Sequence, residues 1–571
     1  MLFKFRKKYK DYEIQPDEIF LDTLNVSGLD QQQFEGVIEQ PIKKSTLVIV
    51  AGLFLCVIVF FSLRLMQLQI LQGEKFSSYS ENNRLRKEHL FAERGVIYDR
   101  NGIEIAWNNQ GKDQSAFLYR AYTSLSGHGH LLGYVEYPQT DSSGNFWRTE
   151  ISGLAGLEKK YNTLLTGVNG TRLREMDAFG NLLSENVINA GEAGKNLYTT
   201  VDTHIQHYLY EAIAQQADEA DFVGGAGSIM NISNGELLAF TSYPEFDPYT
   251  LAEGSNVAAI NGFFSDPGKP FLNRVLSGLY TPGSIVKPFL GIAALNEGLI
   301  TKDTKILSTG SIEVPNRFNP SNSSFFKDWR DGGHGSTDIR HAIADSVNTF
   351  FYAIGGGWKG QEGLGIAGIE KYISAFDITE PTGIDFGREV LGTIPTPEWK
   401  ERLFSDGDWR LGDTYNTSIG QFGFQVTPIQ MTRATAALAN NGILQQPLLV
   451  KSPAISKKIS EDIPLEYYEL IRTAMRDTVT IGTARVINVP YIDSAAKTGT
   501  AQVGVNNEYY NSWIIGFFPY EKPQYAFSIV MERAPRGGEG SAGRAMRNFL
   551  ENVQENYPEF WEETGYNSLA I

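Results

Sequence analysis

Cysteine is almost absent from this chain of 571 residues, since Cys56 is the only one. One cysteine cannot form an intramolecular disulfide. The hydrophobic core must therefore hold the fold together, even if the protein works in an oxidising compartment.

Positive charge is also in deficit, with 50 Lys and Arg against 66 Asp and Glu, for a formal net charge of −16. This balance argues against general nucleic-acid binding, which needs a basic face. We interpret the acidity as a contribution to solubility. Hydrophobic residues make up 42% and charged residues 20%, so most of the chain is expected to fold. The length allows two or three domains, and we find no internal repeat or low-complexity tract.

Long apolar runs are absent except for one, TLVIVAGLFLCVIVFFSL at residues 46–63. Its 18 residues without a charge would span about 27 Å as a helix, close to the hydrocarbon thickness of a bilayer. Lys43 and Lys44 precede it, and Arg64 ends it. Positive charge favours the cytoplasmic side, so we expect a cytoplasmic tail at 1–45, a transmembrane helix at 46–65 and an external remainder.

Two other interpretations of this run were weighed. A cleavable signal peptide is disfavoured because the preceding segment is too long and no small-x-small cleavage site follows. A buried core helix is the other alternative, and the sequence alone leaves it open.

Residues 66–198 are expected to form a stalk and a small accessory domain. Residues 66–90 are polar and helix-friendly, which favours a stalk leaving the membrane. In the segment RGVIYDRNG, at residues 94–102, Asn-Gly follows an alternating run and predicts a tight turn between strands. Short apolar pieces broken by Gly, Asn and Ser then predict a mainly β or mixed domain.

The larger part of the chain, 199–560, is predicted to be one α+β domain. Asp202 is placed to cap a helix through residues 204–220, and Asn234-Gly235 lies between two β-prone runs as in a hairpin. Three β-prone runs follow near the end, and a helix at 545–557 closes the domain. This order predicts an antiparallel sheet flanked by helices. Residues 561–571 are expected to be a C-terminal tail.

Ser284-Ile-Val-Lys287 is the first of three motifs that carry chemistry. Pro282 and Gly283 break the chain before it, and Pro288 is tolerable only near a helix start. Ser284 is therefore predicted at or just before a helix N-terminus, with Lys287 on the same face three residues later. The helix start also favours negative charge that develops beside the serine.

Serine becomes a good nucleophile only when a base takes its proton. Lys287 can act as this base if burial or a neighbouring cation lowers its pKa from about 10.4. Lys497 is a candidate for that cation. A depression of about three units corresponds to about 4 kcal/mol, which a desolvated cleft can supply.

The second motif is Ser346-Val-Asn348. The hydroxyl of Ser346 can pass a proton to a leaving amine, and the Asn348 amide offers both a donor and an acceptor to a substrate. Taken alone, the segment also fits a polar start to an aromatic helix face.

The third motif is Lys497-Thr498-Gly499-Thr500, which precedes AQV and is predicted to lie on a strand beside the cleft. Lys497 supplies positive charge, and the threonine hydroxyls can bind a substrate carboxylate. Gly499 would let a substrate backbone approach closely. We expect the backbone amides of Ser284 and Thr500 to stabilise the oxyanion.

Each motif alone is weak evidence for an active site, because a helix start or a surface turn explains the same residues equally well. Together, in this order, they are the signature of serine enzymes that react with penicillin.

With these motifs the chain, over about residues 45–550, resembles a class B penicillin-binding protein, a monofunctional cell-wall transpeptidase. RGVIYDRNG resembles the start of the family's accessory (pedestal) domain, and GLAGLEKKYNTLLTGVNG resembles its Gly-Leu-Glu segment. Further segments match in order: SGLYTPGSIVKP, PTGIDFGREVLGTIPT, TSIGQFGFQVTPIQM and AKTGTAQV. DWRDGGHGSTDIRHAI, PTPEWK and GDTYNTSIGQ look more like the elongation type (penicillin-binding protein 2) than the division type.

The resemblance implies a fold, a reaction and partners. The catalytic domain would be like that of serine beta-lactamases. Ser284 would be the acyl nucleophile and Lys287 its base. The enzyme would cross-link D-alanyl-D-alanine stem peptides of peptidoglycan at the bacterial cytoplasmic (inner) membrane, and beta-lactams would trap the serine. The implied partners are a SEDS-family, RodA-like glycosyltransferase and other elongation-complex proteins.

Two features depart from the elongation type: Asn348 stands where that type often has aspartate, and 66–198 is short for a pedestal. Some relatives of this type also bind zinc near the cleft. Asp328 and His334 fit part of that pattern, but Val347 occupies the place that a cysteine ligand might take. We therefore expect no cofactor, with Asp328 and His334 as hydrogen-bonding loop residues.

Other functions remain open at this point. A carboxypeptidase or a beta-lactam hydrolase needs a base that activates water, and none can be identified in the sequence. A division-type transpeptidase is a second alternative. A scaffold or beta-lactam sensor is the non-enzyme alternative, although only 45 residues are predicted on the cytoplasmic side.

Overall fold

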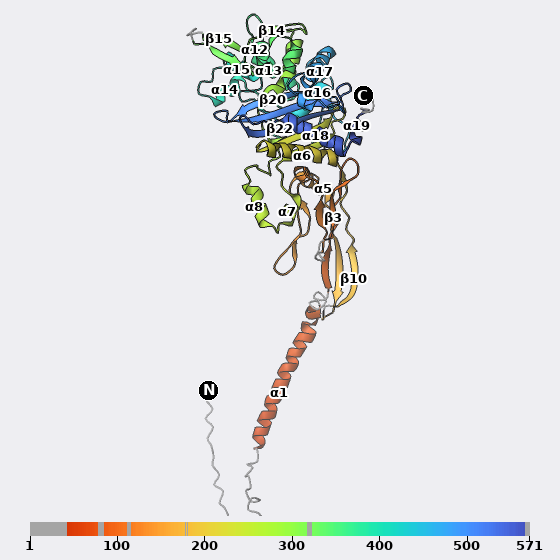
Figure 1. Ribbon diagram of the computed structural model, residues 1–571. Coiled ribbons are helices and arrows are strands. Elements are labelled where there is room, and N and C mark those ends of the chain that lie inside the picture. The colour runs from red at the N-terminus through yellow and green to blue at the C-terminus, as the bar shows by residue number, and fades with distance from the viewer. Residues whose placement is uncertain are drawn as a thin grey trace, which may run out of the picture. The chain divides into compact units, whose positions relative to one another are not determined.

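The structure is a computed structural model, and it describes residues 43–77, 85–110, 116–177, 179, 181–316 and 322–565. The predicted cytoplasmic tail lies almost entirely outside the described residues. Contacts divide the chain into two compact units, one holding residues 1–86 with 175–181 and the other holding 87–174 with 182–571. Figure 1 shows the described elements, several of which are labelled.

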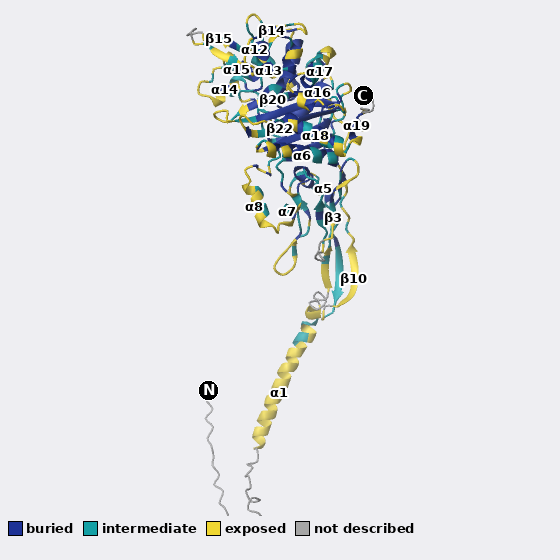
Figure 2. Cartoon of the chain, in the orientation of Figure 1, coloured by how far each residue is buried: buried dark blue, intermediate teal, exposed yellow. Residues whose placement is uncertain are grey.

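The apolar run forms a helix. α1 (Lys44–Met66) continues into the π-helical turn η4 (Gln67–Leu71). Within Lys44–Leu71 an 18-residue window has a mean hydropathy of 2.9, and no residue of the helix is buried. Figure 2 shows α1 exposed along its length. The helix is therefore long and apolar enough to cross a membrane, and it does not have the burial of a core helix.

The helix-friendly sequence of 66–90 does not form a helix at its C-terminal end. Residues Leu85–Leu90 form strand β1 instead of a helix. The pairing of β1 with β9 (Gly170–Met176) overrides local propensity. Glu88 of β1 also forms ion pairs with Arg172 and Arg174 of β9.

The first part of the larger unit is a mixture of small sheets and short helices, as expected. Its further elements are β2 (Ile97–Tyr98), β3 (Glu104–Asn109), β4 (Tyr119–Tyr122), α3 (Gly129–Leu132), β5 (Val135–Glu136), β6 (Gln139–Thr140), β7 (Phe146–Arg148), β8 (Ser152–Gly153), α4 (Gly156–Lys160), α5 (Asn162–Leu165), β10 (Leu182–Asn189) and β11 (Leu197–Tyr198). The predicted turn at Asn101-Gly102 joins β2 to β3.

A buried charge cluster ties this region together. Glu158, in the Gly-Leu-Glu segment, is fully buried. Its carboxylate accepts hydrogen bonds from Arg94 Nε and Arg120 Nε, both at 2.6 Å. RGVIYDRNG and the Gly-Leu-Glu segment, 64 positions apart, thus meet in one ion-pair network, and removal of one charge from such a network is strongly destabilising.

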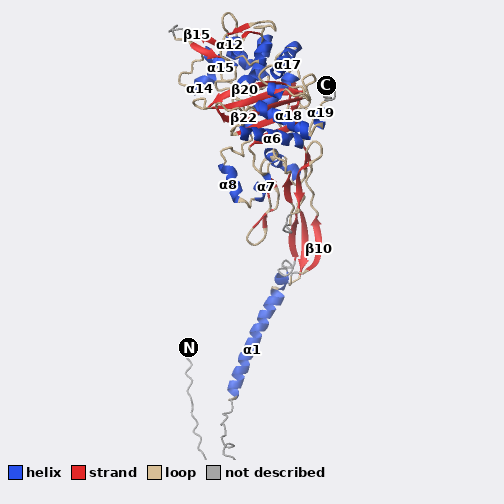
Figure 3. Ribbon diagram, in the orientation of Figure 1, coloured by secondary structure: helices blue, strands red, loops and turns tan. Residues whose placement is uncertain are grey.

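The rest of the larger unit is the predicted α+β domain, whose alternation of helices and strands is visible in Figure 3. Its strands are β12 (Gly224–Asn231), β13 (Leu237–Tyr243), β14 (Ile306–Ser308), β15 (Ser311–Val314), β16 (Ser324–Lys327), β17 (Gly335–Thr337), β18 (Ile443–Gln445), β19 (Ser456–Lys458), β20 (Ala495–Val503), β21 (Tyr509–Phe518) and β22 (Tyr525–Pro535). Its helices are α6 (Thr203–Glu219), α7 (Pro248–Glu253), α8 (Val257–Ser265), α9 (Arg274–Ser277), η5 (Gly283–Val286), α10 (Lys287–Asn296), α11 (Ile339–Ala344), α12 (Asn348–Gly356), α13 (Gly365–Ala375), α14 (Pro397–Leu403), α15 (Leu411–Ser418), α16 (Pro428–Ala439), α17 (Leu465–Thr480), η6 (Arg485–Ile487), α18 (Ala542–Asn556) and α19 (Glu559–Glu563).

The central sheet has the order β13-β12-β22-β21-β20, and every neighbouring pair is antiparallel. α6 and α18 pack together on one face, and α16 packs against the sheet from the other side (Figure 1). Asp202 caps α6 as predicted, since its carboxylate accepts hydrogen bonds from the amides of His204 and Ile205. The antiparallel sheet and its flanking helices are confirmed.

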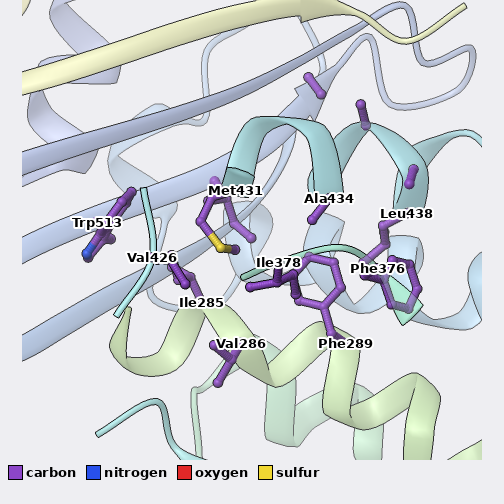
Figure 4. Packing of buried hydrophobic residues seen from close by; sticks show 14 of the residues in the cluster. Ile285, Val286, Phe289, Phe376, Ile378, Val426, Met431, Ala434, Leu438 and Trp513 are labelled. Carbon is purple, nitrogen blue, oxygen red and sulfur yellow. The ribbon is translucent and has the colours of Figure 1, made fainter. Parts of the chain in front are cut away.

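The core extends beneath the first motif. In Figure 4 the side chains of Ile285 and Phe289 point toward apolar residues of α16 and its neighbours. Burial of such side chains contributes about 1.5–3 kcal/mol each and fixes the serine-bearing turn in place.

The ordered domain also extends further than expected. Trp561, which we assigned to a C-terminal tail, is 2% exposed and packs against Phe518. Residues 566–571 lie outside the described part of the chain.

Candidate active site

Ser284 lies in η5, the 3-10 turn that runs directly into α10. Gly283 has φ +60°, a left-handed conformation that glycine adopts at no steric cost. Pro288 falls in the first turn of α10, where its missing donor does no harm. The prediction that Ser284 is at or just before a helix start is confirmed.

Lys287 begins α10 and is fully buried. Its Nζ is 2.8 Å from the Ser346 carbonyl oxygen, 3.2 Å from Ser346 Oγ and 2.7 Å from Asn348 Oδ1. The first and second motifs, about 60 positions apart, therefore meet at this nitrogen.

The second motif joins α11 to α12. Ser346 has φ +56°, an uncommon conformation for a residue other than glycine. Non-glycine residues in this region store strain and cluster at functional sites. Both polar oxygens of Ser346 reach Lys287 from this conformation.

The third motif lies on β20, the edge strand of the central sheet, as predicted. Lys497 is fully buried, and its Nζ donates to the Thr498 carbonyl oxygen at 2.8 Å. Thr498 is half-buried and Thr500 is exposed.

The first and third motifs also touch. A Cβ on Gly499 would lie 2.8 Å from the Pro282 carbonyl oxygen, and one on Gly283 would lie 3.0 Å from that of Thr500. Glycine at 499 therefore lets the serine-bearing turn approach the strand. The close approach of a substrate backbone to Gly499 remains a prediction.

The two lysines shape the electrostatics of the site. Burial, reinforced by the nearby Lys497 ammonium, holds the pKa of Lys287 well below that of a free lysine, while the Asp328 carboxylate opposes the shift. Burial lowers the pKa of Lys497 to about 7, against the opposing charge of Asp345.

A lowered pKa favours the neutral form of the Lys287 amine. A neutral amine has two N–H donors, which the Ser346 carbonyl and Asn348 Oδ1 can accept. Its lone pair is then left for a hydroxyl proton, as a general base requires.

Two residues at the site were missed by the sequence reasoning. Thr483, which follows α17, places its Oγ1 2.6 Å from Thr498 Oγ1. Trp513 of β21 donates from Nε1 to the Thr281 carbonyl oxygen at 3.1 Å, just before the serine-bearing turn. Both lie in ordinary local sequence, so only the fold reveals them.

The metal candidates lie together, with His334 Nε2 3.4 Å from Asp328 Oδ1. A structural zinc site needs about four ligands. Within the ranges that the structure describes, no group of three or more His, Cys, Asp or Glu could hold a metal, and Val347 is fully buried beside Ser346. The residues present do not fit a zinc ion.

A half-buried serine at a helix start, a buried lysine three residues later, a second serine with an amide, and a lysine-bearing edge strand define the class of serine acyl-transfer enzymes that react with penicillin. A family profile described as the penicillin-binding protein transpeptidase domain matches residues 225–551, more than half of the chain. A second, the penicillin-binding protein dimerisation domain, matches 113–199. The chain belongs to the penicillin-binding protein transpeptidase family, and it is of class B.

Several relatives and solved structures that resemble the chain are of the elongation type. The peptidoglycan D,D-transpeptidase MrdA of Escherichia coli strain K12 is 28% identical over 596 residues, covering 86% of this chain and 90% of the relative. Helicobacter pylori PBP2, solved in complex with MreC, is 26% identical with a TM-score of 0.67, covering 83% of this chain and 99% of that one. A chain from a peptidoglycan synthase complex that coordinates polymerization and crosslinking is 25% identical with a TM-score of 0.69, covering 90% of this chain and 98% of that one.

Proposed function

We propose that this protein is an elongation-type D,D-transpeptidase that cross-links peptidoglycan stem peptides through an acyl-enzyme on Ser284. The observation that carries the proposal is the buried Lys287 amine, hydrogen-bonded to Ser346 and Asn348 one helical turn after the serine. Its lowered pKa suits a base that works at neutral pH.

In the first half-reaction, Lys287 takes the hydroxyl proton as Ser284 Oγ attacks the carbonyl carbon of the D-alanyl-D-alanine bond. The amides of Ser284 and Thr500 stabilise the oxyanion. The C–N bond breaks, the leaving D-alanine amine receives a proton by way of Ser346, and the ester on Ser284 remains.

In the second half-reaction, an amine of a neighbouring stem peptide attacks the ester carbonyl. A peptide bond forms as the bond to Ser284 Oγ breaks, and the proton returns to the serine. Asn348 binds the substrate amide, while Lys497, Thr498 and Thr500 bind its terminal carboxylate, and Gly499 lines the strand beside it. A beta-lactam enters the first half-reaction and stays on the serine.

The assignment of the chain's parts follows from the same proposal. Residues 1–45 face the cytoplasm, 46–65 cross the inner membrane, 66–198 form the stalk and pedestal, and 199–560 form the transpeptidase domain outside. Lys43 and Lys44 at the start of α1 support this orientation. A SEDS-family, RodA-like glycosyltransferase and an MreC-like protein are the proposed partners, by analogy with the relatives solved in such complexes.

The test is Ser284→Ala in the full-length chain. We expect loss of stem-peptide cross-linking by the purified protein in detergent micelles and failure to support wall growth in cells that depend on this chain. Normal growth with the variant would instead favour a scaffold. Release of bound penicillin within seconds from the unaltered protein would favour a hydrolase.

A further inference from the structure

Helix α12 begins at Asn348, but the residue before it does not cap the helix. The residue at the N-cap position is Val347, which has no side-chain acceptor. The first amides of a helix have no partner inside the helix, and burial makes such a donor costly. Thr349, the second residue of α12, is 2% exposed, so its amide needs an acceptor from elsewhere.

Asp328 supplies that acceptor from a loop 21 positions earlier. Its Oδ2 accepts hydrogen bonds from the Thr349 amide at 2.9 Å and from Thr349 Oγ1 at 3.0 Å. Its Oδ1 accepts the amide of Trp329 at 2.8 Å. A carboxylate at this end of a helix is also favoured by the helix dipole.

The loop that bears Asp328 is itself held in place. The Asp328 amide donates to the Gly310 carbonyl oxygen at 2.8 Å. Ser308, which is buried, has its Oγ 2.7 Å from Thr349 Oγ1 and accepts the His334 amide at 3.2 Å. Asp328 therefore links a fixed loop to the residue that follows Asn348.

We infer that Asp328 is a positioning residue that, without a metal ion, anchors the start of α12 and so holds Ser346 and Asn348 against the Lys287 amine. The inference rests on the proposed function of Ser284 and Lys287. In this inference, the contact between the Asp328 carboxylate and Thr349 holds the loop in place. A zinc ion does not take that role, because the residues present do not fit one.

The test is Asp328→Asn in the full-length chain in detergent micelles, with penicillin acylation rates measured from pH 5 to 9. Asparagine offers one acceptor oxygen instead of two, so we expect acylation to slow about 10- to 100-fold, the range for groups that orient others at a site. Asp331→Asn is the matched control, because Asp331 is exposed on the same loop, and it should acylate like the unaltered chain.

The pH profile separates this role from simple destabilisation. The charged groups that act on Lys287 are Lys497 on β20 and Asp328. Removal of the Asp328 charge lowers the pKa of Lys287 further, so the acid limb of the profile should move to lower pH. An unmoved limb, with a rate within about twofold of the unaltered chain, overturns the inference.

Thr349 gives an independent variant if Asp328→Asn does not fold. Thr349→Val removes the hydroxyl contact and should slow acylation, whereas Thr349→Ser should restore it. Full activity of Thr349→Val contradicts the inference. Loss of acylation after dialysis against a chelator, with recovery on addition of Zn²⁺, contradicts its metal-free part. Loss of all labelling by the unaltered chain would instead refute the proposed function.

Discussion

Lys287 is the residue on which the proposed chemistry depends, because a serine without a base is a poor nucleophile. Its amine is buried among Ser346, Asn348 and the ring of Phe351, 5.3 Å away. Burial and, secondarily, the positive charge of Lys497 both penalise protonation, so the pKa of Lys287 is lowered and its neutral form is favoured.

The rate of penicillin acylation should therefore fall as the pH is lowered through the depressed pKa of Lys287. Below that pKa the amine is protonated and has no lone pair to accept the serine proton. Stopped-flow acylation of the full-length chain between pH 5 and 9 measures this. A flat profile across that window contradicts the role.

Lys287→Arg tests the same role independently of the pH profile, because a guanidinium keeps its proton at every accessible pH. We expect acylation to fall about 100-fold or more, the contribution typical of a general base. Lys371→Arg, at an exposed ion pair with Glu297, is the control and should leave the rate unchanged.

At the scale of residues, the sequence predicted which motifs come together, but not the contacts that hold them in position. The motif residues were identified because the proposed catalysis would restrict their type and order. Thr483, Trp513 and the capping role of Asp328 were not, because each acts through a partner distant in sequence.

At the scale of elements, the serine-bearing turn η5 is held between a loop and a strand. The Gly283 amide donates to the Gly420 carbonyl oxygen at 3.0 Å, and Gly420 has φ +75°. A Cβ on Gly420 would lie 2.2 Å from the Gly283 carbonyl oxygen. The three atoms nearest to that carbon are all backbone atoms of Gly283, so the carbon could be accommodated only if the turn moved.

Gly420→Ala should therefore displace η5 and slow acylation at least about tenfold, a typical effect of small displacements near reacting groups. It should also lower the melting temperature. Gly298→Ala is the matched control, because Gly298 has φ +70° but nothing within 4 Å of the added carbon. The Gly298→Ala variant has only the backbone strain of about 1–2 kcal/mol, without a steric clash. It should therefore keep the acylation rate of the unaltered chain. Equal rates for Gly420→Ala and the unaltered chain contradict the proposed fixation of the turn.

Elements were predictable where a local signal agreed with the fold. The Asp202 cap, the hairpin at Asn234-Gly235 and the late strands were all predicted from local pattern. β1 was not, since its pairing with β9 depends on residues about 85 positions away. The C-terminal boundary failed for a similar reason, because the packing partners of Trp561 come from distant strands.

At the scale of the whole molecule, the first and second parts of the larger unit are joined by a half-buried carboxyl group. The Glu245 oxygens accept the amides of Gly127 at 2.6 Å and Gly129 at 2.7 Å. Burial raises the pKa of Glu245 to about 7, and the charges of Asp247 and Glu211 add to the effect. The contact spans residues assigned to the pedestal and to the transpeptidase domain.

The contribution of Glu245 to stability should be fully present below about pH 4.3, the unfolded value, and be lost as the pH rises through about 7. The folded state holds the proton more tightly than the unfolded state in this window. The stability of the unaltered chain relative to Glu245→Gln should fall by up to about 3 kcal/mol between pH 4 and 8. Thermal unfolding at several pH values measures it.

Glu253→Gln, at an exposed position on α7, is the matched control for replacement of a glutamate by glutamine. A constant difference between the unaltered chain and Glu245→Gln across this range contradicts a raised pKa for Glu245.

The most direct measurement is the location of the covalent adduct after the full-length protein is treated with penicillin. Peptide mapping by mass spectrometry should place one acyl group on the peptide that carries Ser284, and Ser284→Ala should remove it. An adduct on another residue, or labelling that persists in the variant, would contradict an active site built around this serine.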